Sequence, residues 1–371
     1  MLGPVNVDGK ILKRGYTTGM CAAAAAKAAT ILLFGGGPVA EVEVATPAGI
    51  ALTLAIHGEE SGEGYARCYV RKDAGDDPDV TDGLAIWAEA RRIPRGIRIK
   101  GGRGVGTVTR PGLAVPPGNP AINPVPFQVI QREVAGVLPA GAGVEITISV
   151  PGGEEVATKT MNARLGILGG ISILGTTGVV EPMSEEAIKS SLALQISQAL
   201  AQGHRNLILT PGRQGEKLAA ERYGLPAEAV VQMSNFAGFM LKECARQGVE
   251  RVLLFGHHGK LVKVAAGIFQ THSRVADGRL ETIITHAALL GAKPEVIAEI
   301  WRSATAEETV EILQRHNLSQ VFAQIAAVAS RRSREYAREE LAVGTVLVSL
   351  AGEILGMDAA AAEIWAQIAS R

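Results

Sequence analysis

Cysteines and aromatic residues are scarce in this chain of 371 residues. It contains three cysteines, and aromatic residues make up 4% of it. The cysteines, Cys21, Cys68 and Cys244, lie far apart without a C-x-x-C pair, so the sequence indicates neither a disulfide framework nor an iron–sulfur or zinc cluster. We expect buried thiols in a reducing cytoplasm. The low aromatic content favours close backbone packing over base-stacking platforms.

An excess of charge of either sign is also missing. Lys and Arg together number 37, as do Asp and Glu, so no overall field attracts nucleic acid or an anionic membrane. We find neither a charged and then apolar leader nor a run of about 18 apolar residues. We therefore expect a cytoplasmic protein that binds neither nucleic acid nor membrane.

Glycine is abundant instead, at 44 residues, and the length allows two domains with a sizeable core in each. Residues 1–155 contain short apolar or alternating runs separated by Gly/Pro turns, and a helical pattern at only two places. The runs are 41–45, 51–56, 65–71, 84–90, 97–100 and 144–150, and the helical patterns are 20–34 and 125–136. We predict an α+β N-terminal domain with a largely antiparallel sheet.

Residues 156–371 show a different pattern, in which apolar runs of strand length alternate with helical patterns. The runs are 171–174, 206–209, 229–232, 251–255 and 345–350, and residues 281–338 are mostly helical. This alternation predicts an α/β domain with a doubly wound, Rossmann-like sheet and a helical C-terminal part. Ligands bind beyond the carboxyl ends of the strands in such sheets.

The first helical pattern begins at Thr17-Thr18 and continues through five alanines, residues 22–26. A threonine hydroxyl can accept from the free N–H groups of a first turn, and alanine is the best helix former. Lys27 is its only charge, so we expect the helix to be buried. Because the first turn has no acid and Arg14 flanks it, the helix start is either an anion site or the end of a tightly packed core helix.

Three glycine-containing turns, 175–178, 212–216 and 256–259, each end an apolar run. Glycines let a ligand approach the backbone, and helix N–H groups then face it. None of the turns matches a standard dinucleotide or phosphate fingerprint. A single glycine turn is usually only a turn, whereas three at one edge of one sheet would form a nucleotide-like pocket. Glu216 either pairs with ribose hydroxyls or favours the first turn of a helix.

His257-His258 and the acidic stretch 72–83 each invite a metal-binding interpretation. Neighbouring side chains point apart and no partner cluster is evident, so we predict that a histidine contacts a ligand and that no metal is bound. The acidic stretch lacks the glycine and terminal glutamate of a calcium loop, which leaves a cation site or a solvated turn. Basic residues near the turns can together neutralise a substrate with many carboxylates.

Several of these stretches together resemble the cobalt-precorrin-5B (carbon-1) methyltransferase family of the anaerobic cobalamin pathway. The matching stretches are 14–19 with the alanines that follow, 72–81, 108–115, 120–126, 162–182, 210–213, 256–260 and 271–277. They cover most of residues 13–280, and the helical tail carries little of the match. Met20 departs from the family's pattern, in which a smaller polar residue is usual.

The resemblance implies transfer of a methyl group from S-adenosylmethionine to carbon 1 of a contracted tetrapyrrole, giving cobalt-precorrin-6A. Cobalt would enter only as part of this polycarboxylate substrate. A sulfonium methyl is already an excellent electrophile, so positioning of donor and acceptor supplies most of the catalysis. A homo-oligomer or transient contacts with other enzymes of the pathway stay open.

We place the methyl donor at the three glycine turns and the macrocycle between that pocket and the first domain. The expected donor-binding residues are Gly175, Thr176, Thr177, Gly178, Gly212, Arg213, Gly215, Glu216 and Gly256. The expected substrate-binding residues are Arg14, Thr17, Thr18, Gly19, Arg110, Arg164 and Arg274. His257 and Asp277 are the polar groups that we expect beside the reacting ring.

Two other functions stay open on the sequence alone. One is a nicotinamide-dependent tetrapyrrole reductase, which the missing glycine fingerprint argues against. The other is a non-catalytic corrinoid carrier, which would bind the tetrapyrrole and show no affinity for the methyl donor.

Overall fold

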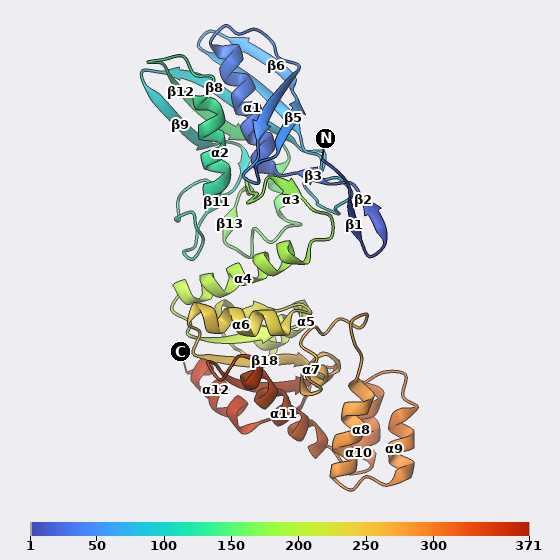
Figure 1. Ribbon diagram of the computed structural model, residues 1–371. Coiled ribbons are helices and arrows are strands. Elements are labelled where there is room, and N and C mark those ends of the chain that lie inside the picture. Colours follow the sequence, from blue (N-terminus) through green and yellow to red (C-terminus); the bar gives the residue numbers. More distant parts are fainter. Residues whose placement is uncertain (1, 371) are drawn as a thin grey trace. The chain divides into compact units, whose positions relative to one another are not determined.

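The computed structural model describes residues 2–370 (Figure 1). The chain divides into two compact units, residues 1–185 (unit 1) and residues 186–371 (unit 2). The predicted boundary after residue 155 lies too early, because strands beyond it pair within unit 1. β13 (Ile167–Leu168) pairs with β11 (Thr107–Val108), and β15 (Val179–Val180) pairs with β3 (Gly15–Tyr16).

Unit 1 is built on a five-stranded sheet in the order β6-β7-β8-β12-β9. Its strands are β6 (His57–Gly62), β7 (Tyr65–Arg71), β8 (Ala85–Ile93), β9 (Gly96–Gly101) and β12 (Gly143–Ser149). Neighbouring strands are antiparallel except β12 and β9, which are parallel. This agrees with the predicted α+β unit and its largely antiparallel sheet.

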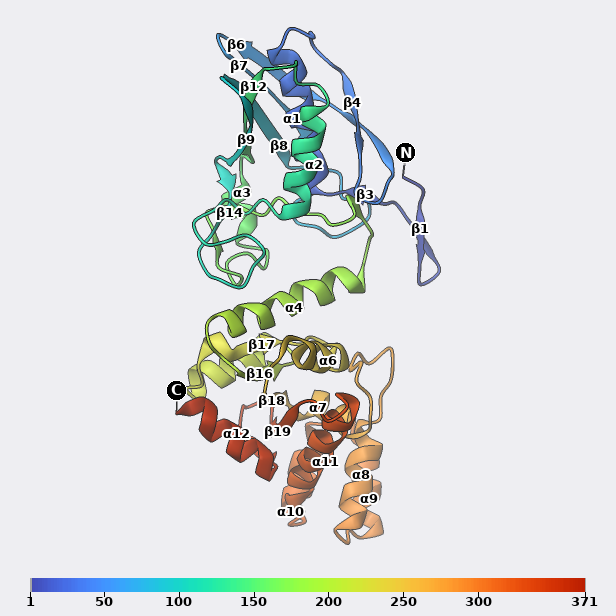
Figure 2. The same cartoon turned by 60° about the vertical axis from the view of Figure 1, so that its left-hand side comes forward.

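Helix α1 (Thr18–Leu33) forms the centre of the unit 1 core, with α2 (Pro124–Ala135) beside it (Figures 1 and 2). The side chain of Thr17 caps α1 by accepting from the Met20 N–H. The alanines 22–26 are fully buried against β7, β8 and α2, since a methyl side chain lets neighbouring backbones approach closely. The predicted buried alanine-rich helix is confirmed.

Smaller elements extend unit 1 around this core. Two antiparallel hairpins are formed by β1 (Val5–Val7) with β2 (Lys10–Leu12) and by β4 (Glu41–Ala45) with β5 (Ala51–Ala55). The strand β10 (Gly104–Val105) pairs in parallel with β14 (Gly170–Ile171), next to the short helix α3 (Gly153–Ala157). The β11–β13 region has a small core of its own, which includes Val108, Val115, Ala121, Leu165 and Ile167.

Unit 2 is built on a second five-stranded sheet, in the order β17-β16-β18-β19-β20. Its strands are β16 (Asn206–Thr210), β17 (Val230–Gln232), β18 (Arg251–His257), β19 (Ala342–Val348) and β20 (Ile354–Met357). The first four are parallel, and β20 is antiparallel to β19. A mixed α/β unit follows the first unit, as the alternating pattern predicted.

Helices cover both faces of this second sheet. One core includes buried residues of α4 (Glu185–Ala201), α6 (Ala237–Gln247), α7 (His258–Ala265) and α11 (Gln320–Tyr336). The other face packs against α12 (Ala359–Ala369) and the segment that follows α5 (Arg213–Lys217). Successive residues of β18 alternate between the two cores, as Leu253 and Leu254 show, because strand side chains point to opposite faces.

The predicted helical stretch 281–338 is confirmed by α8 (Arg279–Leu289), α9 (Pro294–Trp301), α10 (Glu308–Arg315) and most of α11. Among the described residues, no helix combines the length and the apolar character that a membrane crossing requires. Cys21, Cys68 and Cys244 are free and buried, as predicted, and burial raises the pKa of the Cys21 thiol to about 12.

Candidate active site

Two of the three glycine turns meet at the carboxyl edge of the second sheet. The strands β16 and β18 are parallel neighbours, so the turns that follow them lie side by side. A Cβ atom on Gly256 would lie 2.5 Å from Cδ of Pro211, which shows how closely the two turns pack. Gly212 has open space where a side chain would stand. The sheet therefore brings Gly212 and Gly256 together, as the sequence indicated.

The third turn, Gly175–Gly178, belongs to unit 1, and its predicted place at the end of a strand of the second sheet is wrong. The Gly19 N–H donates to the Leu174 carbonyl at 3.0 Å, and the Thr17 N–H donates to the Gly178 carbonyl at 3.1 Å. Gly175 has a φ of +137°, and a Cβ there would lie 2.3 Å from Oγ1 of Thr17. Thr176 and Thr177 complete this turn.

The residues after Gly212 have different surroundings. Arg213 is exposed, and within residues 2–370 its guanidinium group makes no hydrogen bond or ion pair. Gly215 is buried, and a Cβ there would lie 3.1 Å from Cβ of Thr210. The Glu216 carboxylate accepts from Nε2 of Gln232 at 2.7 Å, which ties α5 to the end of β17. Glu216 also lies in the first turn of α5, so both interpretations of this acid stay open.

His257 and His258 both face one carboxylate, that of Glu307. The His257 Nε2 atom lies 3.0 Å from Oε2 of Glu307, and the His258 Nδ1 atom lies 3.6 Å from the same oxygen. The expectation that the two side chains point apart is wrong. Their ring centroids are 4.6 Å apart, because the chain changes from strand β18 to helix α7 between them.

Two neighbouring residues determine how these groups are held. The Leu350 N–H donates to Oε1 of Glu307 at 2.9 Å, which leaves the other carboxylate oxygen for the histidines. Gly259 provides the space for the His257 ring, because a Cβ there would lie 2.9 Å from its Cε1. Any larger residue at this position would therefore displace the His257 ring.

Burial and hydrogen bonds act in opposite directions on the charges of this cluster. Burial lowers the pKa of His258, which has no exposed surface, and outweighs the carbonyl and carboxylate groups around it. Burial alone would raise the pKa of Glu307, but the hydrogen bonds from His257 and Leu350 lower it below its usual range. A carboxylate therefore faces a buried neutral imidazole. One ligand atom from each of His257, His258 and Glu307 lies within 4.8 Å of the others.

Asp277 lies in the loop between α7 and α8 and is held by cations. Both oxygens accept from the Arg279 guanidinium, at 2.8 and 2.6 Å, and this pairing is the main reason why the pKa of Asp277 falls to about 2. The buried ammonium of Lys263 anchors the same loop by donating to the Ala276 carbonyl at 2.9 Å. A carboxylate with so low a pKa stays charged at neutral pH, so Asp277 suits an ionic contact with a cation better than the acceptance of a proton. Arg274 is exposed on this loop.

The predicted substrate arginines of unit 1 lie in two places. Arg14 pairs with Glu181 at 3.0 Å and is half-buried. Arg110 is exposed and packs its side-chain carbons beside Gly166, while Arg164 is half-buried two residues before that glycine. The β11–β13 region therefore brings Arg110 and Arg164 to one part of the unit.

The predicted anion site at the start of α1 is buried. Thr17 and Thr18 are 6% and 4% exposed, and the Gly19 N–H is bonded to Leu174. The Thr18 hydroxyl accepts from the Leu174 N–H at 3.0 Å. These three residues thus hold the 171–178 segment against α1, and their contact with substrate stays a prediction.

The acidic stretch is a structural loop. Each of its five aspartates accepts a hydrogen bond from a backbone N–H, and these residues are Asp73, Asp76, Asp77, Asp79 and Asp82. The buried ammonium of Lys72 lies 3.3 Å from Asp79. These hydrogen bonds to backbone N–H groups give each aspartate of the stretch a structural role.

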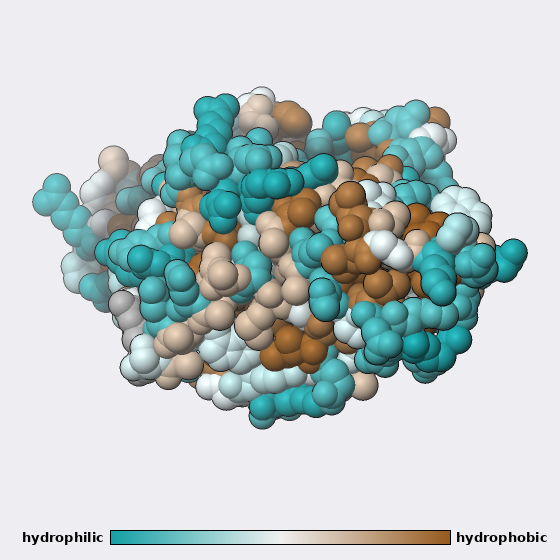
Figure 3. Space-filling model, turned by 90° about the horizontal axis from the view of Figure 1, so that it is seen from below, coloured by the Kyte–Doolittle hydropathy of each residue, from teal (hydrophilic) through white to brown (hydrophobic). Residues whose placement is uncertain are grey.

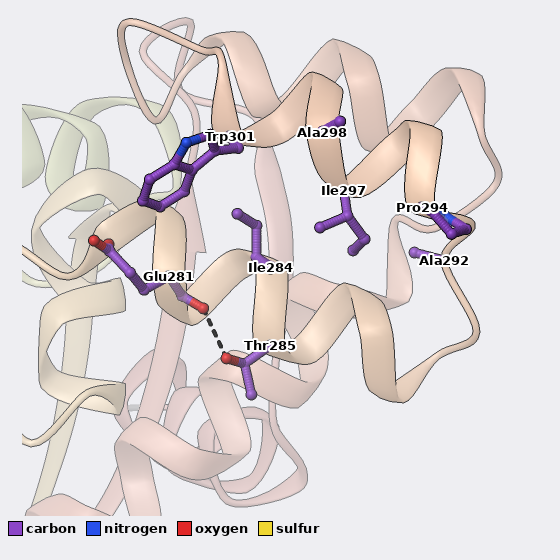
Figure 4. Close-up of a pocket in the computed structure, with 8 residues that line it drawn as sticks. All are labelled: Glu281, Ile284, Thr285, Ala292, Pro294, Ile297, Ala298 and Trp301. Carbon is purple, nitrogen blue, oxygen red and sulfur yellow. Dashed lines mark hydrogen bonds between the residues drawn. The ribbon is translucent and has the colours of Figure 1, made fainter.

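A pocket of about 660 Å³ lies between α8 and α9 (Figure 4). It is lined mostly by apolar side chains, among them Trp301, which is 60% exposed, and its single acid is Glu281. Hydrophobic residues gather among polar ones on the surface seen from below (Figure 3).

A smaller pocket of about 250 Å³ is lined by Asp277, Arg279 and residues 304–306, beside Glu307.

Sequence reasoning missed two residues of this edge. Glu307 lies 50 residues after His257, and no local pattern joins them. Ser234, which follows β17, has a φ of +51°, a conformation that is uncommon for residues other than glycine. The turn before α10 is held by Thr305 and Glu308, since the Glu308 N–H donates to the Thr305 hydroxyl and the Glu308 carboxylate accepts from the Ala304 N–H.

Comparison with known proteins identifies the family. Residues 5–182 match the family model described as CbiD, and residues 270–359 match the model of the CbiD C-terminal domain. The protein of Moorella thermoacetica named cobalt-precorrin-5B C(1)-methyltransferase is 51% identical over 95% of this chain and 97% of its own length. The protein of the same name from Thermoanaerobacter sp. is 50% identical over 92% of this chain and 94% of its own.

A solved structure is also similar. The crystal structure of the cobalamin biosynthesis protein CbiD from Archaeoglobus fulgidus shares 30% sequence identity, covers 73% of this chain and 86% of that chain, and has a TM-score of 0.39. On the family matches and the two curated relatives, this chain belongs to the CbiD family of cobalt-precorrin-5B C(1)-methyltransferases.

Proposed function

We propose that this protein is a C-methyltransferase that methylates carbon 1 of cobalt-precorrin-5B, with S-adenosylmethionine as the methyl donor, in cobalamin biosynthesis. The observation that carries the proposal is the similarity to relatives with this name along almost the whole chain. The product would be cobalt-precorrin-6A, and cobalt would enter as part of the substrate.

We infer that unit 2 binds the donor in a Rossmann-like manner at the carboxyl ends of β16 and β18. β16 and β18 are neighbours in the sheet, and the chain leaves them in opposite directions, toward β17 on one side and toward β19 on the other. The strand order therefore reverses between β16 and β18, which makes this place a topological switch point. Crevices at such switch points are the usual ligand sites of open α/β sheets. Gly212, Arg213, Gly215, Glu216 and Gly256 are the donor-binding residues in this proposal.

We propose that Arg14, Arg110, Arg164 and Arg274 bind the macrocycle. Arginines suit a polycarboxylate because their guanidinium groups bind carboxylates in a bidentate geometry. Arg110 and Arg164 flank the β11–β13 region, and Arg14 flanks the turn at 175–178. His257 and Asp277 are assigned to the reacting ring, with Glu307 as the residue that orients His257.

Mass spectrometry of anaerobic incubations with cobalt-precorrin-5B and labelled S-adenosylmethionine tests the reaction. We expect the macrocycle to gain one labelled methyl group. Turnover that requires a reduced nicotinamide and leaves the label in the donor would favour a reductase instead. Tight binding of the tetrapyrrole without affinity for the donor would favour a carrier.

Calorimetry with S-adenosylmethionine tests the donor site. We expect Arg213→Ala to weaken donor binding about tenfold, the effect of losing one charge-assisted hydrogen bond of about 1.4 kcal/mol. Arg246→Ala is the control, because Arg246 pairs with Glu243 in the last turn of α6, at the opposite edge of the sheet. Equal affinities of the two variants would show that the donor binds elsewhere.

A further inference from the structure

The cluster of His257, His258 and Glu307 has the chemistry of a metal site. Two imidazoles and one carboxylate are the ligands of many sites for Zn²⁺ and other divalent transition metals. The three residues come from the end of β18, the start of α7 and the residue that precedes α10. His258 is fully buried, whereas the side chains of His257 and Glu307 are 27% and 29% exposed, so one side of the cluster is open to solvent.

The ring of His258 is surrounded by hydrogen-bond acceptors. Its Nε2 atom lies 2.9 Å from the Ala306 carbonyl oxygen, and its Nδ1 atom lies 3.3 Å from that of Val348 and 3.6 Å from Oε2 of Glu307. When the Nε2–H donates to the Ala306 carbonyl, Nδ1 is turned toward the oxygens of Val348 and Glu307, so a cation bound at Nδ1 would lie among oxygen atoms.

The surroundings of the cluster match those of ligands held for a metal. Histidines that bind metals usually donate their other ring N–H to a carbonyl or carboxylate, which fixes the tautomer. The contact between His258 and Ala306 is of this kind. The Leu350 N–H occupies one oxygen of Glu307, and Gly259 makes room for the His257 ring. Backbone groups therefore orient His258 and Glu307, and the space beside Gly259 accommodates the His257 ring.

We propose that Nε2 of His257, Nδ1 of His258 and Oε2 of Glu307 bind one divalent transition metal ion, such as Zn²⁺ or Co²⁺. Ligands about 2.1 Å from a tetrahedral metal lie about 3.4 Å apart. Oε2 of Glu307 lies 3.0 Å from Nε2 of His257 and 3.6 Å from Nδ1 of His258, and all three atoms lie within 4.8 Å of one another, so rotation of the half-buried His257 and Glu307 side chains would complete the geometry. Three protein ligands leave a fourth position on the open side for water or a carboxylate.

This proposal departs from the prediction, made from the sequence, that no metal is bound, and it does not depend on the methyl transfer. In the metal-bound form His257 is a ligand, so it does not accept a proton from the macrocycle. The site is distinct from the cobalt of the substrate, because all of its ligands are side chains of this protein.

Titration of the full-length protein, stripped of metal with a chelator, tests the proposal. We expect Co²⁺ to bind at one equivalent with visible absorption bands of low-coordinate cobalt, and Zn²⁺ to displace it, since Zn²⁺ binds such ligands more tightly. Glu307→Gln and His257→Gln each remove one ligand from the partly exposed side, and each is expected to weaken binding at least about tenfold. Circular dichroism checks that both variants are folded.

Glu299→Gln is the matched control. Glu299 lies 3.3 Å from His316 as an exposed His–Glu pair of the same unit, without a second histidine. We expect this variant to bind Co²⁺ like the unchanged protein. The proposal is overturned if the unchanged protein binds no stoichiometric Co²⁺, if Glu307→Gln binds it equally well, or if Glu299→Gln weakens binding as much.

Discussion

At the scale of single residues, the buried carboxylate of Glu133 joins α1, α2 and β4. It accepts from Lys27 at 3.0 Å, from the Ala45 N–H at 3.2 Å and from Arg132 at 3.0 Å. Burial alone would raise the pKa of Glu133, but the hydrogen bonds from Lys27 and Arg132 lower it below its usual range. The charge of this acid is therefore part of what holds the alanine-rich helix in place.

We expect Glu133→Gln to lower the free energy of unfolding by about 1–3 kcal/mol at pH 7, because Lys27 loses its charged partner. The folded-state pKa is depressed, so the stabilisation is present above the unfolded-state pKa of about 4.3 and is lost as the pH falls through the folded value. The free energy of unfolding of the variant should therefore fall less steeply below about pH 5 than that of the unchanged protein.

Urea unfolding followed from pH 7 to pH 3 measures both effects. Glu60→Gln is the control, since Glu60 pairs with Arg67 on the surface and both side chains are more than 40% exposed. Such pairs contribute little to stability. A Glu133→Gln variant that follows the control at every pH would contradict this account of the buried charge.

Gly259→Ala tests the position of the His257 ring. The new Cβ would lie 2.9 Å from Cε1 and 3.1 Å from Nδ1 of His257, so the ring has to move. Displacing a positioned group by about 1 Å can cost up to about a hundredfold in rate. We expect kcat/KM to fall at least about tenfold with little change in the unfolding temperature. Gly136→Ala, whose Cβ would meet nothing closer than 3.7 Å, should leave kcat/KM unchanged.

The residues of the candidate site were only partly predictable from the sequence. Gly256 and His257 end β18 and Gly212 follows β16, so their common edge follows from local pattern and parallel pairing. Glu307 has no such signal, because its approach to His257 depends on how α10 packs. The aspartates of the 72–83 stretch resembled ligands, whereas their partners are backbone N–H groups supplied partly by Lys13 and Met183.

At the scale of elements, local signals predicted α1, β4, β7 and β18 well. Residues 171–174 were assigned wrongly to the second sheet, since an apolar run indicates burial and not the core in which it is buried. Ile171 and Ile173 belong to the core around α1. β6 was missed because its sequence, HGEESG, has no apolar alternation at this edge of the sheet.

Ala24→Leu tests the close packing of α1. Leucine forms helices nearly as well as alanine, so the substitution changes volume more than helix propensity. Ala24 is fully buried in the core around α1, and the extra carbon atoms have no space. We expect the free energy of unfolding to fall by about 1–3 kcal/mol. Ala362→Leu, on the exposed face of α12, should change it by less than about 0.5 kcal/mol. Urea unfolding at constant pH measures both variants.

At the scale of the whole molecule, the sequence predicted two units correctly but placed their boundary about 30 residues too early. The composition changes near residue 151, but the chain returns to the first unit through β13, β14 and β15 before α4 begins. Pairing between segments that are distant in sequence determined the boundary, and such pairing leaves little local signal. Among residues 2–370, each hydrophobic core draws its residues from one unit.

Separate cores predict that the two units fold independently when the chain is divided between Met183 and Ser184, before α4. We expect residues 1–183 and 184–371 each to unfold cooperatively, as measured by circular dichroism. The fragment 184–371 contains the carboxyl edge of the second sheet, so it should bind S-adenosylmethionine within about threefold of the full-length affinity.

Neither fragment alone should transfer a methyl group, because the proposed substrate arginines of unit 1 and the donor site of unit 2 are then on different molecules. Mixing the fragments is expected to restore little activity, since each described hydrophobic core belongs to one unit. Donor binding by 1–183 and none by 184–371 would place the methyl donor in the first unit. In that case the turn at 175–178, and not the second sheet, would be its site.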